Sequence, residues 1–471
     1  MNNSKKNLIF VAIFQIYTIM RKTFSLLLCL GVSLGLAAQK TNLRDYVSIR
    51  FIPNHADWVY AVGEGVEIEV AAIRHYVPIP AAEVHYEWGM EQRKPEEVGI
   101  LRTGAQGVHQ LRLSGATQPG FKTLTASVEV DGKTYTNSIN LAFAPDEIRP
   151  MTQLPADFET FWQSSIEQAR HVPLKPLLTL LPERCTPDAD VYEVRFQNFQ
   201  EGQYLYGTLA VPRGVDPLRV CPSTSPLKGN YSAGVDTCVS VEQYPAVVLW
   251  PGAGVKPHPG DVDFFPAHGV ITLEMGINGI PVNLPQQVYT DLRANALHDY
   301  HNIHLDDRDR YYYRRVYAGT VKTVDFLCSL PCVDTARIVS YGGSQGGALT
   351  IVHAALDARI KAAAVSYPAL SEIAGYVRGR AAGWPKWREL SEEKQMVTEY
   401  YDVVNFARMV HCPVWFMLGY NDQVCCPTST YTVFNTLPCS KTLLTPLDCA
   451  HWMYPEHKQQ RAEWLLEQLT K

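Results

Sequence analysis

The chain lacks an excess of charge of either sign. Its 42 Lys and Arg residues are nearly balanced by 47 Asp and Glu residues, which gives a formal net charge of -5 over 471 residues. A nucleic-acid-binding protein needs a basic field to neutralise phosphates, so nucleic acid is not an expected partner. With 46% hydrophobic and 19% charged residues, the composition is that of an ordinary globular protein with a sizeable core and two or three domains.

The sequence also lacks an uninterrupted apolar run long enough to span a bilayer, which takes about 20 residues. The stretch Leu8 to Ile19 is separated from the stretch Phe24 to Leu36 by the cations Arg21 and Lys22. The second stretch is followed by two alanines, so charged, apolar and small residues succeed one another as in a secretory signal. We therefore expect a signal peptide over residues 1–38, a secreted or periplasmic protein and no membrane span, with an uncleaved anchor as the alternative.

No Cys-x-x-Cys pair is followed by a second pair at zinc spacing, so the sequence gives no sign of a structural metal site. Of eleven cysteines, Cys29 lies in the expected signal, which leaves ten in the mature chain. An even number suits disulfides in an oxidising compartment. The candidate pairs are Cys221 with Cys238, Cys328 with Cys332, and pairs drawn from Cys425, Cys426, Cys439 and Cys449. The sequence does not determine the connectivity.

The segment that says most about function runs from Tyr341 to Gly347 and reads Tyr-Gly-Gly-Ser-Gln-Gly-Gly. It follows the apolar segment 337–341 and precedes the helix-forming segment 348–356, which places Ser344 on a sharp turn between a strand and a helix. This is the Gly-x-Ser-x-Gly pattern of a nucleophile elbow. Such a turn brings two backbones together, so we expect glycine at 342 and 346 to avoid Cβ clashes. A purely structural glycine turn is the alternative.

A serine hydroxyl becomes a nucleophile only when a base takes its proton and an acid orients that base. In hydrolases with this elbow, the order along the chain is Ser, then Asp or Glu, then His. Asp422 follows the apolar segment 413–418, and His451 precedes an expected terminal helix, so we predict Ser344, Asp422 and His451 as a catalytic triad. The competitors are weaker, because Asp448 is too close to His451 in the chain and His457 falls within the terminal helix.

The oxyanion formed during attack on an ester needs two preset donors. We expect the backbone N–H of Gln345, directly after the serine, and that of Ala253, in the loop after segment 246–250. Gly252-Ala253-Gly254 lacks the third glycine of a dinucleotide-binding loop, so no cofactor is expected. A cluster of histidines and aspartates between residues 298 and 309 resembles a metal site superficially, but a solvated polar loop is the favoured interpretation.

The pattern of hydrophobic residues divides the mature chain into two parts. From residue 39 to about 146, short alternating runs are separated by turn signals such as Asp131-Gly132, which predicts an all-β, immunoglobulin-like sandwich with Trp88 in its core. After a linker at residues 144–150, apolar strands alternate with helices over residues 147–471, which predicts an α/β domain with a mostly parallel sheet. The β domain has no catalytic constellation; it is expected to be structural, with carbohydrate binding as the alternative.

From about Leu154 to the end, the sequence resembles the acetyl xylan esterase and cephalosporin C deacetylase family, carbohydrate esterase family seven. The stretches that carry the resemblance are residues 155–162, 305–317, 342–347, 401–407 and 422–430. The resemblance implies an α/β-hydrolase fold in which Ser344, Asp422 and His451 remove acetyl groups from short xylo-oligosaccharides and small esters without a cofactor. It also weakens the metal interpretation of the histidine loop.

The sequence departs from the family pattern in three places. The family's Arg-Gly-Gln-Gly is replaced by residues 275–279, a tyrosine of the oxyanion loop is replaced by Ala253, and the β domain and the segment 221–238 are additions. The additions could block the family's ring-like hexamer, so the assembly stays open, a homo-oligomer included. The rival functions are another hydrolase activity, such as a feruloyl esterase or oligopeptidase, and a catalytically dead sugar-binding or adhesion protein.

Overall fold

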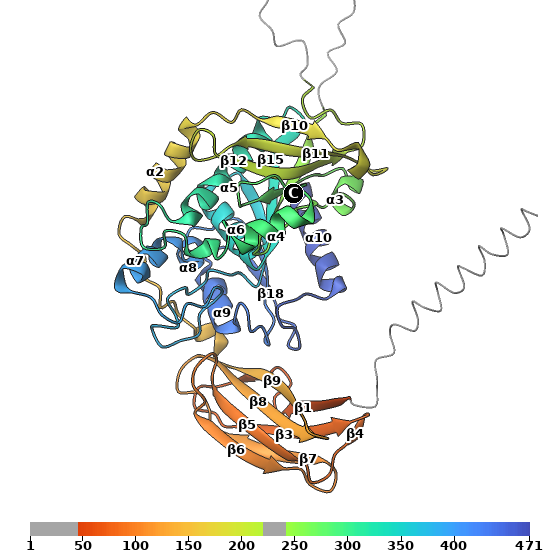
Figure 1. Cartoon of the computed structure of the whole chain (residues 1–471), viewed down its shortest axis with the longest axis vertical. Coiled ribbons are helices and arrows are strands. Elements are labelled where there is room, and N and C mark those ends of the chain that lie inside the picture. Colours follow the sequence, from red (N-terminus) through yellow and green to blue (C-terminus); the bar gives the residue numbers. More distant parts are fainter. Residues whose placement is uncertain (1–45, 220–241) are drawn as a thin grey trace, which may run out of the picture.

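The computed structural model describes residues 46–219 and 242–471. The expected signal peptide and the candidate cysteine pair Cys221 and Cys238 lie outside the described residues. Two bodies of different architecture follow one another along the chain (Figure 1). We call residues 47–143 the β unit and residues 144–471 the α/β unit.

The β unit consists of two sheets that pack around a shared core, and no helix occurs in it. One sheet contains β1 (Val47–Pro53), β3 (Val66–Arg74), β4 (Val77–Pro78) and β7 (Val108–Leu113). The other contains, in spatial order, β2 (Val59–Tyr60), β9 (Lys133–Phe143), β8 (Gly120–Val130), β5 (Glu83–Met90) and β6 (Glu97–Arg102). The core draws residues from both sheets, and Trp88 lies fully buried in it, as predicted.

The predicted Asp131-Gly132 turn joins β8 to β9. Asp131 has φ 53° and Gly132 has φ 75°, so both turn positions adopt the left-handed conformation. Turns of this hand match the right-handed twist of the strands that they connect. The turn fixes the register in which Val130 pairs with Lys133, and this register extends to the pair of Gly120 and Phe143 at the far end of the hairpin.

The α/β unit is built on one nine-stranded sheet, and the parallel interior predicted from the sequence is confirmed. The strands, in spatial order, are β10 (Leu177–Leu180), β11 (Ala189–Gln197), β12 (Tyr204–Pro212), β14 (Ile271–Gly276), β13 (Tyr244–Trp250), β15 (Val333–Gly343), β16 (Ile360–Ser366), β17 (Val414–Met417) and β18 (Lys441–Leu444). The strands from β14 to β18 are parallel, and β10, β11 and β12 form an antiparallel edge. The central parallel strands β13, β16 and β17 are mostly apolar and buried, because both faces of the sheet are covered.

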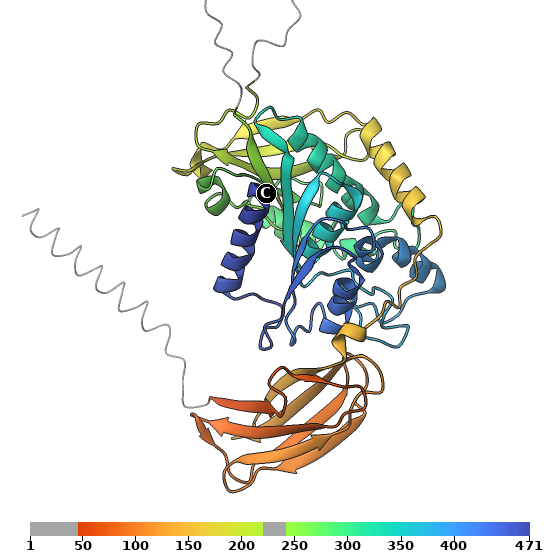
Figure 2. The same ribbon diagram turned by 180° about the vertical axis from the view of Figure 1, so that it is seen from behind.

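Helices cover both faces of this sheet (Figures 1 and 2). The helices are α2 (Phe158–His171), α3 (Phe264–Ala267), α4 (Gln286–Ala294), α5 (Tyr312–Cys328), α6 (Gln345–Leu356), α7 (Glu392–Tyr401), α8 (Val403–Ala407), α9 (Pro427–Thr436) and α10 (Pro455–Thr470). The larger core includes residues of α2, α5, α6, α8 and α9, whereas α3 and α10 close a second core on the opposite face. Within the described ranges, no helix is both long and apolar enough to cross a membrane.

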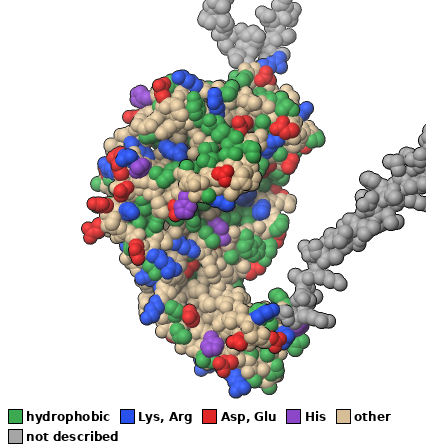
Figure 3. All heavy atoms as spheres, viewed as in Figure 1, with side chains coloured by type: hydrophobic (Ala, Val, Ile, Leu, Met, Phe, Trp, Pro, Cys, Tyr) green, Lys and Arg blue, Asp and Glu red, His purple; other side chains and the backbone are tan. Residues whose placement is uncertain are grey.

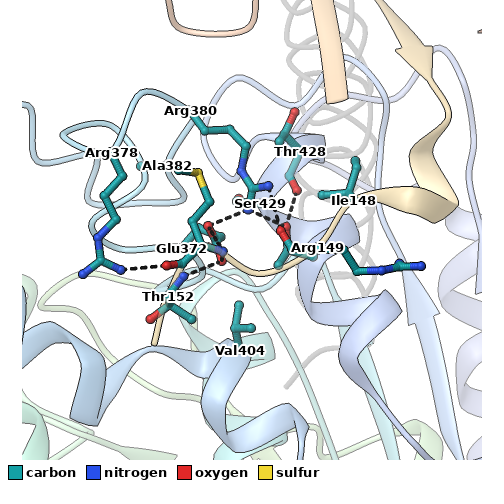
Figure 4. Close-up of polar contacts among 12 residues, drawn as sticks. Ile148, Arg149, Thr152, Glu372, Arg378, Arg380, Ala382, Val404, Thr428 and Ser429 are labelled. Atoms are coloured by element: carbon teal, nitrogen blue, oxygen red, sulfur yellow. Dashed lines mark hydrogen bonds and ion pairs between the residues drawn. The ribbon is translucent and has the colours of Figure 1, made fainter. Parts of the chain in front are cut away.

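A buried carboxylate anchors the segment that connects the two units (Figure 4). Glu372 accepts hydrogen bonds from the backbone N–H groups of Met151, at 3.0 Å, and Thr152, at 3.4 Å. Its other oxygen forms an ion pair with Arg380 at 2.6 Å, and Arg380 also donates to the carbonyl oxygen of Arg149 at 2.8 Å. The side chain of Glu372 is fully buried, so these partners supply the charge compensation that burial requires. The segment that connects the units is therefore held against the α/β unit at residues 149–152.

The expected disulfides are not formed among the described cysteines, all of which are free thiols. Each candidate instead contacts a different group. Cys328 accepts from the Arg359 guanidinium, Cys426 donates to the carbonyl of Ala382, and Cys425 lies against Ser344. An even cysteine count made pairing plausible, but burial as small apolar side chains explains these positions better.

Candidate active site

The segment around Ser344 forms the predicted elbow at the junction of β15 and α6. Ser344 has φ 60° and ψ -125°, a strained conformation for a residue other than glycine. A Cβ atom on Gly342 would lie 2.5 Å from the backbone of Gly346, and one on Gly346 would lie 2.1 Å from the carbonyl oxygen of Trp250. Both glycines are thus required, as the sequence predicted, because the turn packs directly against the end of β13.

Asp422 and His451 lie together on two neighbouring loops beyond β17 and β18. Nδ1 of His451 is 2.8 Å from Oδ2 of Asp422. The other carboxylate oxygen, Oδ1, accepts from the backbone N–H groups of Val424, at 2.7 Å, and Cys425, at 2.9 Å. The Asp422 side chain is completely buried, whereas that of His451 is 25% exposed. A fixed, buried carboxylate that orients an accessible imidazole is the arrangement needed for a general base.

Two side chains connect the elbow to this pair. The Cys425 thiol, three residues after Asp422, lies against the side chain of Ser344, and burial raises the pKa of this thiol well above its usual range. The ring of Tyr367 lies 4.7 Å from the His451 ring, centroid to centroid, and borders Gly343 of the elbow. Among the described residues, no hydrogen bond joins Ser344 to His451; Tyr367 is the side chain that borders both the elbow and the His451 ring.

The two expected oxyanion donors lie on segments that touch. Gln345 is the first residue of α6, and the contact of Gly346 with Trp250 brings the loop containing Ala253 to the elbow. In the described part of the chain, neither the Gln345 nor the Ala253 backbone N–H donates to a protein acceptor. Both donors are therefore available to a ligand oxygen. The positive end of the α6 macrodipole also lies at this point.

Buried tyrosines hold the oxyanion segments in place. The Gln345 side-chain oxygen accepts from the hydroxyl of Tyr300, at 2.6 Å, and from that of Tyr313, at 2.8 Å. Burial raises the pKa of both phenols, so they remain neutral donors. Asn278 donates to the carbonyl of Gly254 at 3.2 Å. The segment 275–279, which departs from the family pattern, thus contacts the loop that contains the expected donor Ala253.

The weaker candidates lie outside this arrangement. Asp448 accepts a hydrogen bond from the Tyr454 hydroxyl and is exposed, and His457 lies on α10. The histidines near residue 300 point to different partners, since His298 pairs with Asp299 and His301 packs against Trp384. Across the two described ranges, no three His, Cys, Asp or Glu side chains are grouped to hold a metal ion.

Sequence reasoning missed the residues that support the site. Cys425, Tyr367, Tyr300 and Tyr313 are distant in the chain from the motif that each contacts, and no local spacing marks them. The β unit also reaches the site unexpectedly. Glu91, directly after β5, accepts from the Thr428 backbone N–H at 3.2 Å, and burial raises its pKa to about 8.

The sequence matches the family model described as acetyl xylan esterase over residues 144–221 and 235–468. A curated relative is acetyl esterase Axe7A of Xylanibacter ruminicola, which is 34% identical over 458 residues, covering 95% of this chain and 96% of the relative. The match to this relative therefore includes most of the β unit as well.

Two solved structures share the fold of the α/β unit. The acetyl xylan esterase from Paenibacillus sp. R4 aligns with a TM-score of 0.54 at 21% identity, covering 69% of this chain and 98% of that one. Acetyl xylan esterase 1 from Thermoanaerobacterium sp. JW/SL YS485 aligns with a TM-score of 0.54 at 22% identity, covering 69% of this chain and 97% of that one. These similarities show an α/β-hydrolase-like fold.

Proposed function

This chain belongs to the acetyl xylan esterase family, and we propose that it removes acetyl groups from acetylated xylo-oligosaccharides and related small acetyl esters. It is a carboxylic ester hydrolase. The observation that best supports the proposal is the 2.8 Å hydrogen bond between His451 and Asp422 beside a serine on a glycine-framed elbow. We assign Ser344 as nucleophile, His451 as general base and Asp422 as the acid that orients it.

The proposed reaction proceeds in two stages. The Ser344 Oγ attacks the acetyl carbonyl carbon while His451 takes its proton, and the Gln345 and Ala253 N–H groups bind the negative oxygen. His451, now protonated, gives its proton to the departing sugar oxygen, which leaves an acetylated serine. Water then loses a proton to His451 and attacks this ester, and His451 returns the proton to the Ser344 Oγ as acetate leaves. Asp422 stays ionised throughout and stabilises the imidazolium.

The surroundings of Ser344 favour a small acyl group. The Cys425 side chain contacts Ser344, and Tyr367 borders the elbow, so two side chains lie beside the nucleophile. We expect a bulky feruloyl group to collide with them, whereas an acetyl group need not. This proximity supports acetyl esters over the feruloyl esters and peptide amides that other hydrolases cleave.

The decisive assay compares acetate release from acetylated xylo-oligosaccharide with cleavage of a feruloyl ester and a peptide amide. We expect acetate release to dominate and Ser344→Ala to abolish it while leaving the unfolding transition intact. Activity confined to the feruloyl ester or the amide would refute the substrate assignment. Equal turnover by wild type and Ser344→Ala would refute the role of Ser344.

The proposal also covers the domain organisation, export and assembly of the chain. We assign residues 39–146 to an immunoglobulin-like domain, on the basis of two sheets sharing one core, and residues 147–471 to the hydrolase domain. The charged, apolar and small residues over positions 21–38 support export by a signal peptide covering residues 1–38. N-terminal sequencing of protein recovered from outside the cytoplasm tests the export, and light scattering tests for a homo-oligomer.

A further inference from the structure

A cavity of about 310 Å³ lies where the β unit meets the α/β unit. Glu87 and Thr125 of the β unit line one side, and Lys386 and Gln423 of the α/β unit line the other. This volume lies in the range of sites that bind small molecules. The triad does not use the cavity, and nothing in the proposed reaction explains it.

The wall of the cavity formed by the β unit is one end of a hydroxyl-rich sheet face. Side chains alternate across a strand, so Leu124, Ala126 and Val128 of β8 enter the core, and the residues between them face outward. The outward positions on β8 and β9 are, in paired order, Thr123 with Asn140, Thr125 with Ser138, Ser127 with Thr136, and Glu129 with Thr134. In Figure 3, the junction of the two units is mostly tan, the colour of the backbone and of side chains that are neither hydrophobic, charged nor histidine, with charged side chains around it.

The opposite wall of the cavity is continuous with the active site. Gln423 directly follows Asp422, and its side-chain amide donates to the Ser138 hydroxyl at 2.9 Å. The Lys386 ammonium group donates to the Gln423 carbonyl oxygen, so these two residues form a continuous part of the cavity wall. Trp384, two residues before Lys386, packs against His301 on the side of the hydrolase domain. The cavity thus borders the loop between β17 and α9 that carries Asp422, which we call the acid loop.

The polar groups in the cavity suit a neutral ligand with many hydroxyls. In the described structure, the side chains of Glu87 and Thr125 have no hydrogen-bond partner. Arg93 uses one guanidinium nitrogen to donate to the Tyr376 carbonyl oxygen. Acidic Glu87 faces cationic Arg93 and Lys386 across the same space, so neither sign of charge prevails. Sugar hydroxyls both donate and accept, which matches such a mixture of carboxylate, hydroxyl and cationic groups.

We propose that this cavity is a second sugar-binding subsite, which holds part of an oligosaccharide chain while an acetylated unit of that chain lies at Ser344. The inference rests on the proposed function and extends it. The β unit then makes the enzyme prefer acetylated chains to small acetyl esters, because only a chain can reach both positions. The subsite also gives the β unit, which is an addition to the family pattern, a role in recognising the oligosaccharide chain.

The test measures kcat/KM on acetylated xylotetraose and on 4-nitrophenyl acetate for wild type and Thr125→Phe. The phenyl ring fills the cavity, and an aromatic side chain is compatible with a strand. We expect the ratio of the two values to fall about tenfold, which corresponds to loss of a few hydrogen bonds to the chain. Thr134→Phe is the matched control, since it places the same ring on the same face of the sheet but outside the cavity. An unchanged ratio in Thr125→Phe, or equal falls in both variants, overturns the subsite.

A binding measurement separates this inference from the proposed function. Unacetylated xylotetraose is titrated by calorimetry into Ser344→Ala and into the double variant Ser344→Ala/Glu87→Ala. We expect binding to the first and an affinity at least fivefold weaker for the second. Equal affinities, or no binding to either, overturn the subsite. Failure of wild type to release acetate from any xylo-oligosaccharide overturns the proposed function instead, and the calorimetric result still decides whether the cavity binds the chain.

Discussion

Asn140, at the end of the β unit, donates its side-chain amide to the carbonyl oxygen of Tyr420 at 2.8 Å. Its backbone N–H donates in addition to the side chain of Asn421 at 2.9 Å. These two acceptors immediately precede Asp422, and Glu91 holds Thr428 on the far side of the same loop. The β unit therefore grips the loop that carries the proposed catalytic acid at both ends, which places the added domain within the architecture of the site.

This relationship predicts that Asn140→Ala lowers kcat by about five- to tenfold, because a shift of the acid loop misorients His451. The change also removes the side-chain hydrogen bonds of Asn140 to Tyr420, Glu91 and Thr123, and is expected to lower the free energy of unfolding by about 1–3 kcal/mol. Steady-state kinetics with acetylated xylo-oligosaccharide, together with urea unfolding, measures both effects.

Asn137→Ala is the matched control for Asn140→Ala. Asn137 lies on the same strand and donates its side-chain amide to the Ile49 carbonyl oxygen at 2.8 Å, entirely within the β unit. Because Asn137 is exposed, we expect a smaller loss of stability, with kcat within about twofold of wild type. If the two variants lose kcat equally, the effect arises from general destabilisation and the acid loop does not depend on Asn140.

A second prediction concerns the acid itself. Asp422→Asn preserves the size of the side chain but replaces one oxygen by a donor, so the imidazole can no longer be held in the tautomer that accepts from serine. We expect kcat to fall by about 10³–10⁴-fold with little change in KM. Asp448→Asn is the control, since Asp448 is exposed and is the rejected alternative, and its kcat should stay near that of wild type. If kcat falls further in Asp448→Asn than in Asp422→Asn, Asp448 and not Asp422 is the residue that orients His451.

The sequence predicted the elbow because its chemistry is local. Ser344 and the glycines around it lie within seven residues, and the flanking strand and helix follow from a change in hydrophobic period. The parallel sheet and the Asp131-Gly132 hairpin were predictable for the same reason. The expected chain order of Ser, Asp and His selected Asp422 as the candidate acid and His451 as the candidate base. Whether these two side chains lie close together in space could be learned only from the fold.

The supporting residues were not predictable because their roles exist only after folding. Gln345 was expected as a backbone donor, but the two phenols that hold its side chain come from segments far from the elbow. Contacts between the β unit and the acid loop join residues about 280 positions apart, and single-sequence patterns carry no information at such a separation. Among the described cysteines the disulfide expectation was wrong for a related reason, since a cysteine count does not reveal which thiols face one another.

Glu91 yields a prediction about pH. Burial raises the pKa of Glu91 from 4.5 to about 8, so the folded protein keeps this carboxyl protonated where the unfolded chain ionises it. Stability should therefore fall as the pH rises from about 4.5 to 8, and Glu91→Gln should remove that loss, worth up to roughly 4 kcal/mol above pH 8. Urea unfolding between pH 4 and pH 9 measures the difference. Glu87→Gln changes an exposed residue of β5, the strand directly before Glu91, and should not alter the pH dependence of stability. Parallel plots of stability against pH for wild type and Glu91→Gln would contradict the prediction.

The elbow yields a prediction about glycine. In Gly346→Ala the new Cβ atom would lie 2.1 Å from the Trp250 carbonyl oxygen, so the backbone must shift. We expect a loss of about 3 kcal/mol or more in the free energy of unfolding, together with a large fall in kcat. Gly202→Ala is the control, because Gly202 has φ 81° but no neighbour within 4 Å, and only the strain of about 1 kcal/mol should appear. Gly346 lies within α6 and does not have a positive φ, so equal losses in the two variants would contradict the prediction that the close approach of the backbones requires glycine there.

The last prediction concerns the tyrosines that hold Gln345. The double change Tyr300→Phe/Tyr313→Phe removes both donors to the Gln345 side-chain oxygen and leaves that buried oxygen unpaired. We expect a loss of about 1–3 kcal/mol in stability and a fall of about tenfold in kcat at nearly constant KM, because the N–H of Gln345 binds the oxygen only as charge develops. Tyr317→Phe is the control on the same helix, since its hydroxyl donates to the Tyr401 carbonyl at 3.1 Å and does not touch Gln345. It should lower stability but change kcat by less than about twofold. Equal falls in kcat, or a rise in KM in the double variant, would mean that the tyrosines support the core and not the oxyanion donor.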